Sequence, residues 1–230
     1  MLTPFEVATT QDTGYAGQDT LSGSRLRTNL RDVAAAISPM TAEFLRDIAA
    51  TNVESAMEYG VGTRMETDDA RAAGPVADGY NDSTRSIRIR GLPGGGRSIN
   101  FFGAPGEVDL YMSESLEVSR GPNSILFGFG SPGGLVNIMT KRAQVARNRT
   151  SLRTQVGAWA HRRFELDHNQ VILPGKIALR LNGLLQNSGG WRRWDYNDSS
   201  RGALSLRVSP WKHTTVITNY ENGQMQSHVT

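Results

Sequence analysis

The sequence contains no cysteine, so neither a disulfide framework nor a thiolate metal site is available to the chain. No run of apolar residues approaches the roughly 18 that a transmembrane helix needs. That absence argues against a helical membrane protein but leaves a transmembrane β-strand open, because only every second residue of such a strand faces lipid. Four histidines fall in no metal-ligand spacing, and we expect each to be structural or solvated: His161, His168, His213 and His228.

Motifs of catalysis are also missing. The sequence has no nucleophile elbow, no paired-carboxylate motif and no metal spacing, and the glycines at 94–96 lack the strand, helix and lysine of a phosphate loop. We therefore predict that the protein is not an enzyme and holds no cofactor. The amino terminus has neither the basic nor the apolar region of a signal peptide, so we expect a mature form or a fragment.

Charge divides the chain into two parts. Residues 1–140 carry 11 Lys+Arg and 17 Asp+Glu, whereas residues 141–230 carry 14 and 5. A basic carboxy-terminal part is one feature of nucleic-acid binding. Its arginines, however, occur singly in alternating strands and at turns, without interleaved aromatic residues on which bases could stack. We predict no nucleic-acid partner.

The most organised stretch runs from Leu116 to Arg142, with the sequence LEVSRGPNSILFGFGSPGGLVNIMTKR. Leu116 and Val118 begin a strand pattern, a turn follows at Arg120-Gly121-Pro122, and a second alternation runs from Leu135 to Thr140 after a glycine-rich break. Glycine permits a positive φ where the backbone doubles back, and proline fixes one φ. The spacing alone predicts a compact unit of strand, turn and strand.

The residues of this stretch closely resemble the segment that closes the plug domain of TonB-dependent outer-membrane receptors. The matching positions are Glu117, Arg120, Gly121, Pro122, Ser124, Gly128, Gly133, Gly134, Asn137, Thr140, Lys141 and Arg142. The resemblance implies an α+β plug domain, a small mixed sheet with short helices, at residues 24–142. It also implies that antiparallel strands of a transmembrane β-barrel follow at 143–230.

Residues 1–23 are polar and glycine-containing, and we expect them to be mobile. At their start, LTPFEV is similar to a TonB box, the periplasmic segment that the inner-membrane protein TonB grips. The residues concerned are Leu2, Thr3, Pro4, Phe5, Glu6 and Val7. An extended peptide of this kind binds by adding a strand to a sheet edge, so main-chain hydrogen bonds supply most of the affinity. The implied partner is TonB with its energising complex.

Local signals predict the elements of the plug. Residues 33–40 are typical of a strand or of a short helix leading into one, and Thr41 caps a helix with Phe44, Leu45 and Ile48 on its apolar side. Thr51 and Glu54 form a capping-box pattern for a second helix through about residue 59. Residues 65–84 are predicted as a loop, and 86–91 as a strand with Arg88 and Arg90 on a polar face before Gly91. The resemblance would place these arginines at the plug–barrel interface.

A glycine- and proline-rich loop is predicted at residues 92–108. It offers a cation, an amide and two aromatic rings in Arg97, Asn100, Phe101 and Phe102. In the resembled family, apical plug loops form the floor of the ligand site, which makes these four residues candidate ligand contacts. The alternative is that Phe101 and Phe102 are ordinary core residues.

After Arg142 the sequence alternates with period two. We predict strands near residues 152–158, 164–172, 177–186, 204–208 and 214–220, with proline turns at 174–175 and 209–212 on one, periplasmic, side and a polar–aromatic loop at 188–200. Ile177, Leu179 and Leu181 would face lipid, and Arg180 and Asn182 the lumen. About five strands cannot close a barrel of 22, so we expect an incomplete barrel and an amino-terminal part of a receptor.

The resemblance implies energy-coupled uptake across the outer membrane of a ligand such as an iron–siderophore complex, with outer-membrane lipid as a further partner. The alternative hypothesis is a soluble periplasmic plug-like module that binds a ligand but does not transport it. Solubility without detergent would support that alternative.

Overall fold

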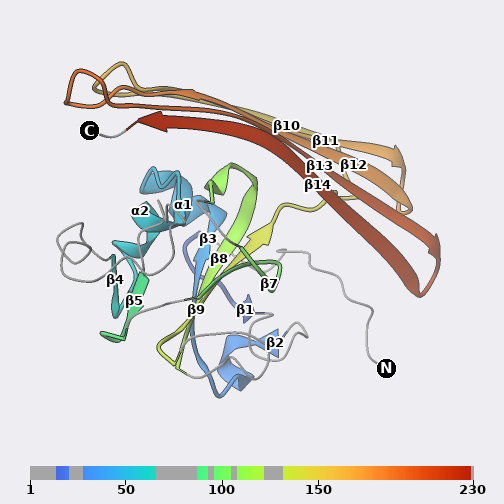
Figure 1. The fold of residues 1–230 in the computed structure, drawn as a ribbon. Coiled ribbons are helices and arrows are strands. Elements are labelled where there is room, and N and C mark those ends of the chain that lie inside the picture. Colours follow the sequence, from blue (N-terminus) through green and yellow to red (C-terminus); the bar gives the residue numbers. More distant parts are fainter. Residues whose placement is uncertain are drawn as a thin grey trace. The chain divides into compact units, whose positions relative to one another are not determined.

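The computed structural model describes residues 14–20, 28–65, 87–92, 96–104, 108–121 and 132–228, and the TonB-box-like residues 2–7 lie outside these ranges. The chain divides into two compact units, Met1–Thr140 and Lys141–Thr230 (Figure 1). The boundary lies two residues before the one placed from the sequence. No helix in the described ranges is long and apolar enough to cross a membrane.

The first unit is built on a mixed sheet of five strands in the order β3-β8-β9-β6-β7. The strands are β3 (Ala36–Thr41), β6 (Gly96–Ile99), β7 (Phe102–Gly103), β8 (Ser113–Arg120) and β9 (Gly134–Thr140). Neighbours are antiparallel except β6 and β9, which are parallel. Two small ladders pair β1 (Asp19–Thr20) with β2 (Thr28–Asn29) and β4 (Thr63–Met65) with β5 (Ile87–Ile89). The predicted α+β class is confirmed.

Within the described ranges this unit also contains two short α-helices and two 3-10 turns: α1 (Ala42–Asp47), α2 (Val53–Met57), η1 (Leu30–Asp32) and η3 (Leu110–Met112). Thr41 caps α1 as predicted, because its hydroxyl accepts a hydrogen bond from the Phe44 amide at 3.2 Å. The cap predicted for α2 is wrong by one residue. The side chain of Asn52, not Thr51, accepts a hydrogen bond from the Ser55 amide at 2.9 Å. The Ser55 hydroxyl in turn accepts one from the Asn52 amide at 3.4 Å.

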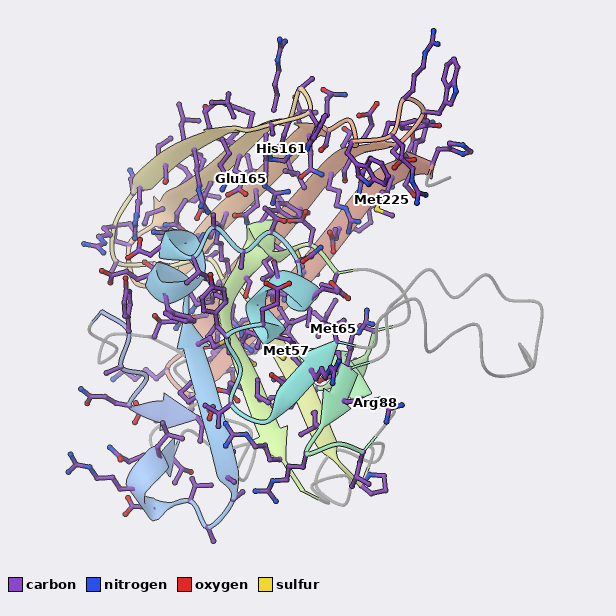
Figure 2. The ribbon with its side chains drawn as sticks, turned by 90° about the vertical axis from the view of Figure 1, so that its left-hand side faces the viewer. Met57, Met65, Arg88, His161, Glu165 and Met225 are labelled. Atoms are coloured by element: carbon purple, nitrogen blue, oxygen red, sulfur yellow. The ribbon has the colours of Figure 1, made fainter. Side chains whose placement is uncertain are left out.

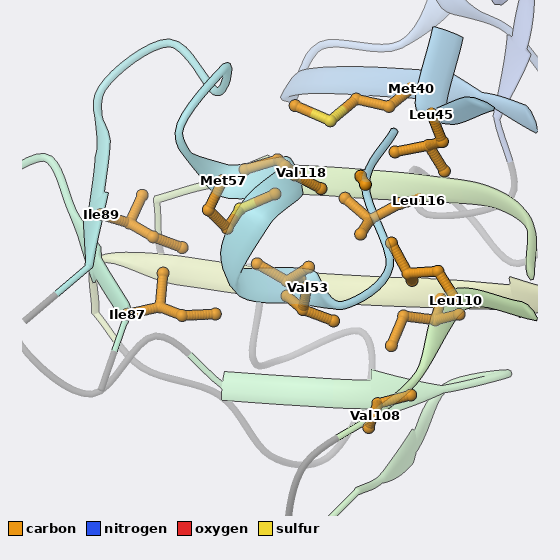
Figure 3. Packing of buried hydrophobic residues seen from close by; sticks show 14 residues of the cluster. Met40, Leu45, Val53, Met57, Ile87, Ile89, Val108, Leu110, Leu116 and Val118 are labelled. Carbon is orange, nitrogen blue, oxygen red and sulfur yellow. The ribbon is translucent and has the colours of Figure 1, made fainter. Parts of the chain in front are cut away.

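The core of this unit lies between the sheet and α2. Val53 and Met57 of α2 are fully buried together with Leu116 of β8 and Ile87 and Ile89 of β5 (Figure 3). Burying an aliphatic side chain of this size contributes about 1.5–3 kcal/mol, so the helix is held by packing more than by its own length.

Five described strands of the first unit were not predicted, and two of them, β1 and β2, are only two residues long. β4 includes Met65, the first residue of the predicted 65–84 loop, and residues 66–86 lie outside the described ranges. β6 and β7 form a hairpin inside the predicted 92–108 loop. Both are two to four residues long, too short for alternation to be visible among glycines and prolines.

The second unit is a sheet of five consecutive antiparallel strands. They are β10 (Arg149–Val156), β11 (Arg162–Leu173), β12 (Ile177–Asn187), β13 (Tyr196–Trp211) and β14 (Thr214–His228). All five predicted strands are confirmed, but β13 and β14 are longer than expected, at 16 and 15 residues. β13 begins at Tyr196, inside the loop predicted to reach residue 200.

Side chains of β12 alternate between the two faces of this sheet, as predicted. Arg180 and Asn182 are 6% and 5% exposed, whereas Leu181 and Leu185 are 41% and 58% exposed. Figure 2 marks Glu165 of β11, which the register with Leu184 places on the same face as Arg180. A polar face and an apolar face therefore run along the same strands.

Candidate functional site

The hairpin between β6 and β7 turns in two residues. Ile99 pairs with Phe102, and between them Asn100 and Phe101 have φ values of +50° and +71°. Positive φ at both central positions is the type I′ turn of tight hairpins, for which asparagine followed by glycine is preferred. A phenylalanine in the second position is conformationally strained. Such strain persists only where surrounding contacts hold it.

Contacts from β9 hold this turn. The carboxamide of Asn100 donates to the Thr140 hydroxyl at 2.8 Å and accepts from the Thr140 amide at 3.2 Å. The carboxamide oxygen of Asn137, a side chain only 1% exposed, accepts from the Phe101 amide at 3.0 Å and from the Ser98 hydroxyl at 2.8 Å. The matched motif residue Asn137 thus fixes the candidate ligand loop directly.

The turn presents an aromatic ring. Phe102 is 78% exposed, so the alternative that it is a core residue is wrong, while Phe101 is half-buried. Arg97 does not bring its charge to the tip. Its guanidinium pairs with Glu54 of α2 at 3.1 Å, with side chains 9% and 15% exposed. The structure therefore groups Asn100, Phe101 and Phe102 and places Arg97 at the other end of β6.

The glycines of the matched motif lie where backbones approach closely. A Cβ at Gly133 would lie 2.8 Å from the Ile89 carbonyl oxygen, and one at Gly134, whose φ is +143°, would collide with the Ser119 carbonyl. Gly121 donates its amide to the Gly133 carbonyl at 2.9 Å. These positions serve chain packing. Pro122 and Gly128 of the same motif lie outside the described residues.

The predicted strand at residues 86–91 ends earlier than expected. Ile89 and Leu92 exchange main-chain hydrogen bonds at 3.1 Å, and Arg90 and Gly91 form the turn between them with φ of +54° and +78°. Arg90 is therefore a turn residue and not part of the polar strand face that was predicted for it. Arg88 does lie on β5, and its guanidinium donates to the Gly91 carbonyl at 3.3 Å (Figure 2).

Two motif side chains on β8 contact segments distant in sequence. Glu117 is 4% exposed and accepts a hydrogen bond from the Thr20 hydroxyl at 3.0 Å. Arg120 donates to the hydroxyl of Ser38 on β3. Thr20 belongs to the short segment that follows the amino terminus, so Glu117 is one of the groups that attach this segment to the sheet.

The same amino-terminal segment has a second, exposed attachment. The Tyr15 hydroxyl donates to the Asp47 carboxylate at 2.5 Å, and its ring meets the Phe44 ring edge-on at 5.3 Å. The hydrogen bond to the Asp47 carboxylate raises the pKa of Tyr15 above its ordinary value. Gly14 adds its carbonyl oxygen, which accepts from the Thr41 hydroxyl at 2.9 Å.

The polar face of the second unit carries an ion-pair network that sequence reasoning did not single out. Asp167 accepts two hydrogen bonds from Arg180, both at 2.8 Å, and lies 3.1 Å from the Lys141 ammonium. Arg163, 2% exposed, pairs with Glu165 at 2.6 Å. The sequence does contain a signal for this network, because the charged residues Arg163, Glu165 and Asp167 of β11 alternate with Phe164 and Leu166.

The chain that enters this sheet is fastened to its polar face. Asn169 of β11 accepts from the Gln144 amide at 2.8 Å and donates to the carbonyls of Gln144 and Arg147 at 2.9 and 2.8 Å. Arg180 adds a hydrogen bond to the Arg142 carbonyl at 3.0 Å. Asparagine mimics the backbone in such contacts, which fix residues 142–147 along the strand.

Comparison with known proteins shows which family these two units resemble. Residues 29–135 match the family model of the TonB-dependent Receptor Plug Domain. The chain is 30% identical over 197 residues to the Metal-pseudopaline receptor CntO of Pseudomonas aeruginosa, an alignment that covers 85% of this chain and 27% of the relative. The chain carries the plug domain of a TonB-dependent receptor. The first barrel strands follow it.

Other matches agree with this family. The chain is 32% identical over 136 residues to the Ferrichrome outer membrane transporter/phage receptor of Escherichia coli, covering 55% of this chain and 17% of that protein. The crystal structure of the ferripyoverdine receptor of Pseudomonas aeruginosa has a TM-score of 0.81 at 18% identity, covering 96% of this chain and 29% of that one. The alcaligin receptor FauA of Bordetella pertussis gives 0.79 at 17% identity, with 96% and 37% covered.

The chain thus spans about a quarter of the length of the curated relatives, 27% of CntO. The structural likeness shows the fold, and the family locates this TonB-dependent receptor chain in the outer membrane. These matches do not favour the alternative of a soluble periplasmic module.

Proposed function

We propose that this chain is part of a receptor that takes up a metal chelate, such as an iron–siderophore complex, across the outer membrane with energy supplied through TonB. The observation that carries the proposal is a plug domain followed at once by strands with one polar and one apolar face. Relatives named as metal-pseudopaline, ferrichrome and ferripyoverdine receptors support a chelate as the ligand class.

Ligand contact is proposed at the β6–β7 turn. Phe102 offers an exposed aromatic face, and Asn100 and Phe101 hold it in a turn that β9 fixes in place. A preorganised ring loses little entropy when a chelate packs on it. Arg97 contributes only if its ion pair with Glu54 opens, so we assign it a weaker role.

Coupling to TonB is proposed through Leu2–Val7. A partner strand pairs with this segment through main-chain hydrogen bonds, and tension then reaches the plug through residues 14–20. The exposed Tyr15–Asp47 contact releases before the buried Thr20–Glu117 contact, because water competes with the first and not with the second.

Orientation in the membrane follows the two sheet faces. Ile177, Leu179 and Leu181 face lipid, and Arg180 and Asn182 face the lumen. We propose that the β11–β12 turn at Pro174 and the β13–β14 turn lie at the periplasmic end; the second turn follows Trp211, so Pro210 belongs to β13 and not to the turn predicted for it.

Uptake of radiolabelled iron and other metals as chelates tests this function in cells that depend on the complete receptor containing residues 1–230. Phe5→Pro removes a main-chain donor inside the TonB-box-like segment and should abolish uptake while chelate binding persists. Thr10→Pro, outside the segment, is the matched control and should transport normally. Phe102→Ala should weaken chelate binding about tenfold, the effect of losing an aromatic contact of roughly 1.4 kcal/mol. Normal uptake by Phe5→Pro would contradict the coupling.

A further inference from the structure

One end of the second unit is basic. This end consists of residues 142–149, 171–178 and 206–217, which contain six Lys or Arg residues and no Asp or Glu. Four of the cations are exposed, and none of them forms an ion pair with any residue of the part of the chain that the structure describes. We name these four the basic rim; they are Arg147, Arg149, Lys176 and Lys212.

The β11–β12 turn holds the centre of the rim. The Lys176 amide donates to the Leu173 carbonyl at 3.0 Å, and Gly175 between them has a φ of +71°. Proline followed by glycine with positive φ is the pattern of a type II turn. The Gly175 amide also donates to the Val145 carbonyl at 3.3 Å, and the Lys176 carbonyl accepts from the Ser209 amide at 2.7 Å. Main-chain hydrogen bonds therefore join this turn to both of its neighbours.

The rim extends across the whole sheet. Arg149 begins β10 at one edge, and Lys212 lies in the turn that the pairing of Trp211 with Thr214 closes between β13 and β14. Neighbouring strands are about 4.8 Å apart, so the three to four strand spacings between these cations amount to roughly 14–19 Å. A single small anion cannot contact all four cations. A polymer that carries repeated negative charges can.

The cations of the rim are not on the lipid-facing row. Ile177 pairs with Val208, and Val208 with Val216, so this row is aliphatic at the basic end. Arg149 pairs with Asn169 and therefore lies on the polar face of the sheet. The other three cations precede β10 or lie in turns. Cations that bind phospholipid headgroups extend from the lipid-facing row, so this arrangement favours a partner in the aqueous phase.

Repeated carboxylates match the chemistry of the rim. An exposed pair of one cation with one carboxylate is weak, because water and salt compete with it. A polymer engages several cations at once, and each further contact is then made at a high effective concentration. Peptidoglycan is such a polymer in the periplasm, because the peptides along its uncharged sugar strands carry carboxylates.

We propose that the basic rim binds the peptide carboxylates of peptidoglycan. The inference rests on the membrane orientation given under the proposed function, which places both turns in the periplasm, but not on the chelate carried. Binding at the rim would hold the receptor beside the cell wall through its barrel strands and leave the first unit out of the contact.

Co-sedimentation of the complete receptor in detergent with isolated peptidoglycan sacculi tests the proposal. A triple variant, Arg147→Gln with Lys176→Gln and Lys212→Gln, should bind at least tenfold more weakly than the parent. Binding by the parent should also fall at high salt, because exposed charges are screened. Sacculi whose carboxylates have been amidated should bind the parent as weakly as native sacculi bind the triple variant.

The matched control removes the same charge from the opposite end of the sheet. Arg162, Arg192 and Arg193 are exposed there, so Arg162→Gln with Arg192→Gln and Arg193→Gln should bind sacculi like the parent. Retention of the heat-dependent shift in gel mobility would show that each variant is folded. Unchanged binding by the rim variant, or equal losses in the two variants, would overturn the proposal.

Two further measurements separate this proposal from its neighbours. Vesicles of phosphatidylglycerol should bind parent and rim variant equally; a loss confined to vesicles would assign the rim to phospholipid and overturn the proposal. Lys176→Cys should react with a membrane-impermeant maleimide only after the outer membrane is permeabilised, and labelling in intact cells would overturn the periplasmic placement. None of these measurements involves a chelate, so a failure of uptake would leave their result unchanged.

Discussion

Arg180 and Asp167 form a two-pronged ion pair across β11 and β12, with Nε–Oδ1 and Nη2–Oδ2 both at 2.8 Å. Asp167→Asn leaves a buried guanidinium without its counter-charge, and removing one partner of a buried pair costs about 3–5 kcal/mol. We expect a loss of about 3 kcal/mol in the free energy of unfolding of the complete receptor, measured by urea denaturation in detergent.

A looser pair on the same sheet provides the control for that prediction. Arg201 and Glu221 are 4.0 Å apart, with side chains 16% and 32% exposed. Glu221→Gln should cost less than about 1 kcal/mol, as partly exposed pairs do. Equal losses for Asp167→Asn and Glu221→Gln would show that burial and two-pronged geometry add nothing at Asp167.

The turn at Asn100 and Phe101 should be improved by glycine at its second position. A non-glycine residue with left-handed φ is strained by about 1–2 kcal/mol, so Phe101→Gly should stabilise the hairpin by about 1 kcal/mol. Hydrogen exchange of the Ala104 amide, which donates to the Arg97 carbonyl at 3.1 Å, should slow about fivefold. Asn100→Gly removes both contacts with Thr140 and should speed that exchange instead.

At the start of α2, Asn52 should contribute to the stability of the helix and its neighbour Thr51 should not. Asn52→Ala removes the side-chain oxygen that receives the Ser55 amide and should destabilise the helix by about 1 kcal/mol. The Ala56 amide, which donates to the Asn52 carbonyl at 3.3 Å, should then exchange about fivefold faster. Thr51→Ala should leave that rate unchanged; a larger effect at Thr51 would restore the cap predicted from sequence.

The attachment of Tyr15 should fail in alkali. The Asp47 carboxylate raises the pKa of Tyr15 above its ordinary value of 10.0, so the contact is fully present below pH 10 and is lost as pH rises through the raised value. A spin label at Ala16→Cys, in a chain without other cysteines, should become more mobile across that transition. Tyr15→Phe keeps the ring contact with Phe44 and should show a mobility that does not change in this pH range.

Prediction from the sequence was most accurate for long strands in which apolar and polar residues alternate. Residues 177–185 had the clearest strand pattern, because Leu179 and Leu181 alternate with Arg180 and Asn182. The same reasoning missed the start of β13, because residues 196–200 are polar or aromatic on both faces. Strand pairing with β14 extends β13 there without any apolar period.

Single-residue detail in the plug was less predictable. Thr51 and Asn52 are both good caps, and Glu54, read as the capping partner, instead pairs with Arg97 from β6. Phe102 looks like a core residue in isolation, yet the two-residue turn points it to solvent. The exposure of Phe102 depends on a hairpin whose first strand, β6, pairs in parallel with β9; that pairing joins residues about 40 positions apart and leaves no local signal.

Asn169 fixes the segment that joins the two units to the sheet of the second unit. Asn169 makes three hydrogen bonds to Gln144 and Arg147, and Arg180 donates a fourth to the Arg142 carbonyl. These bonds attach the first residues of the second unit to β11 and β12. A force applied to the first unit should therefore leave residues 142–147 attached to the second unit, because four hydrogen bonds hold them there.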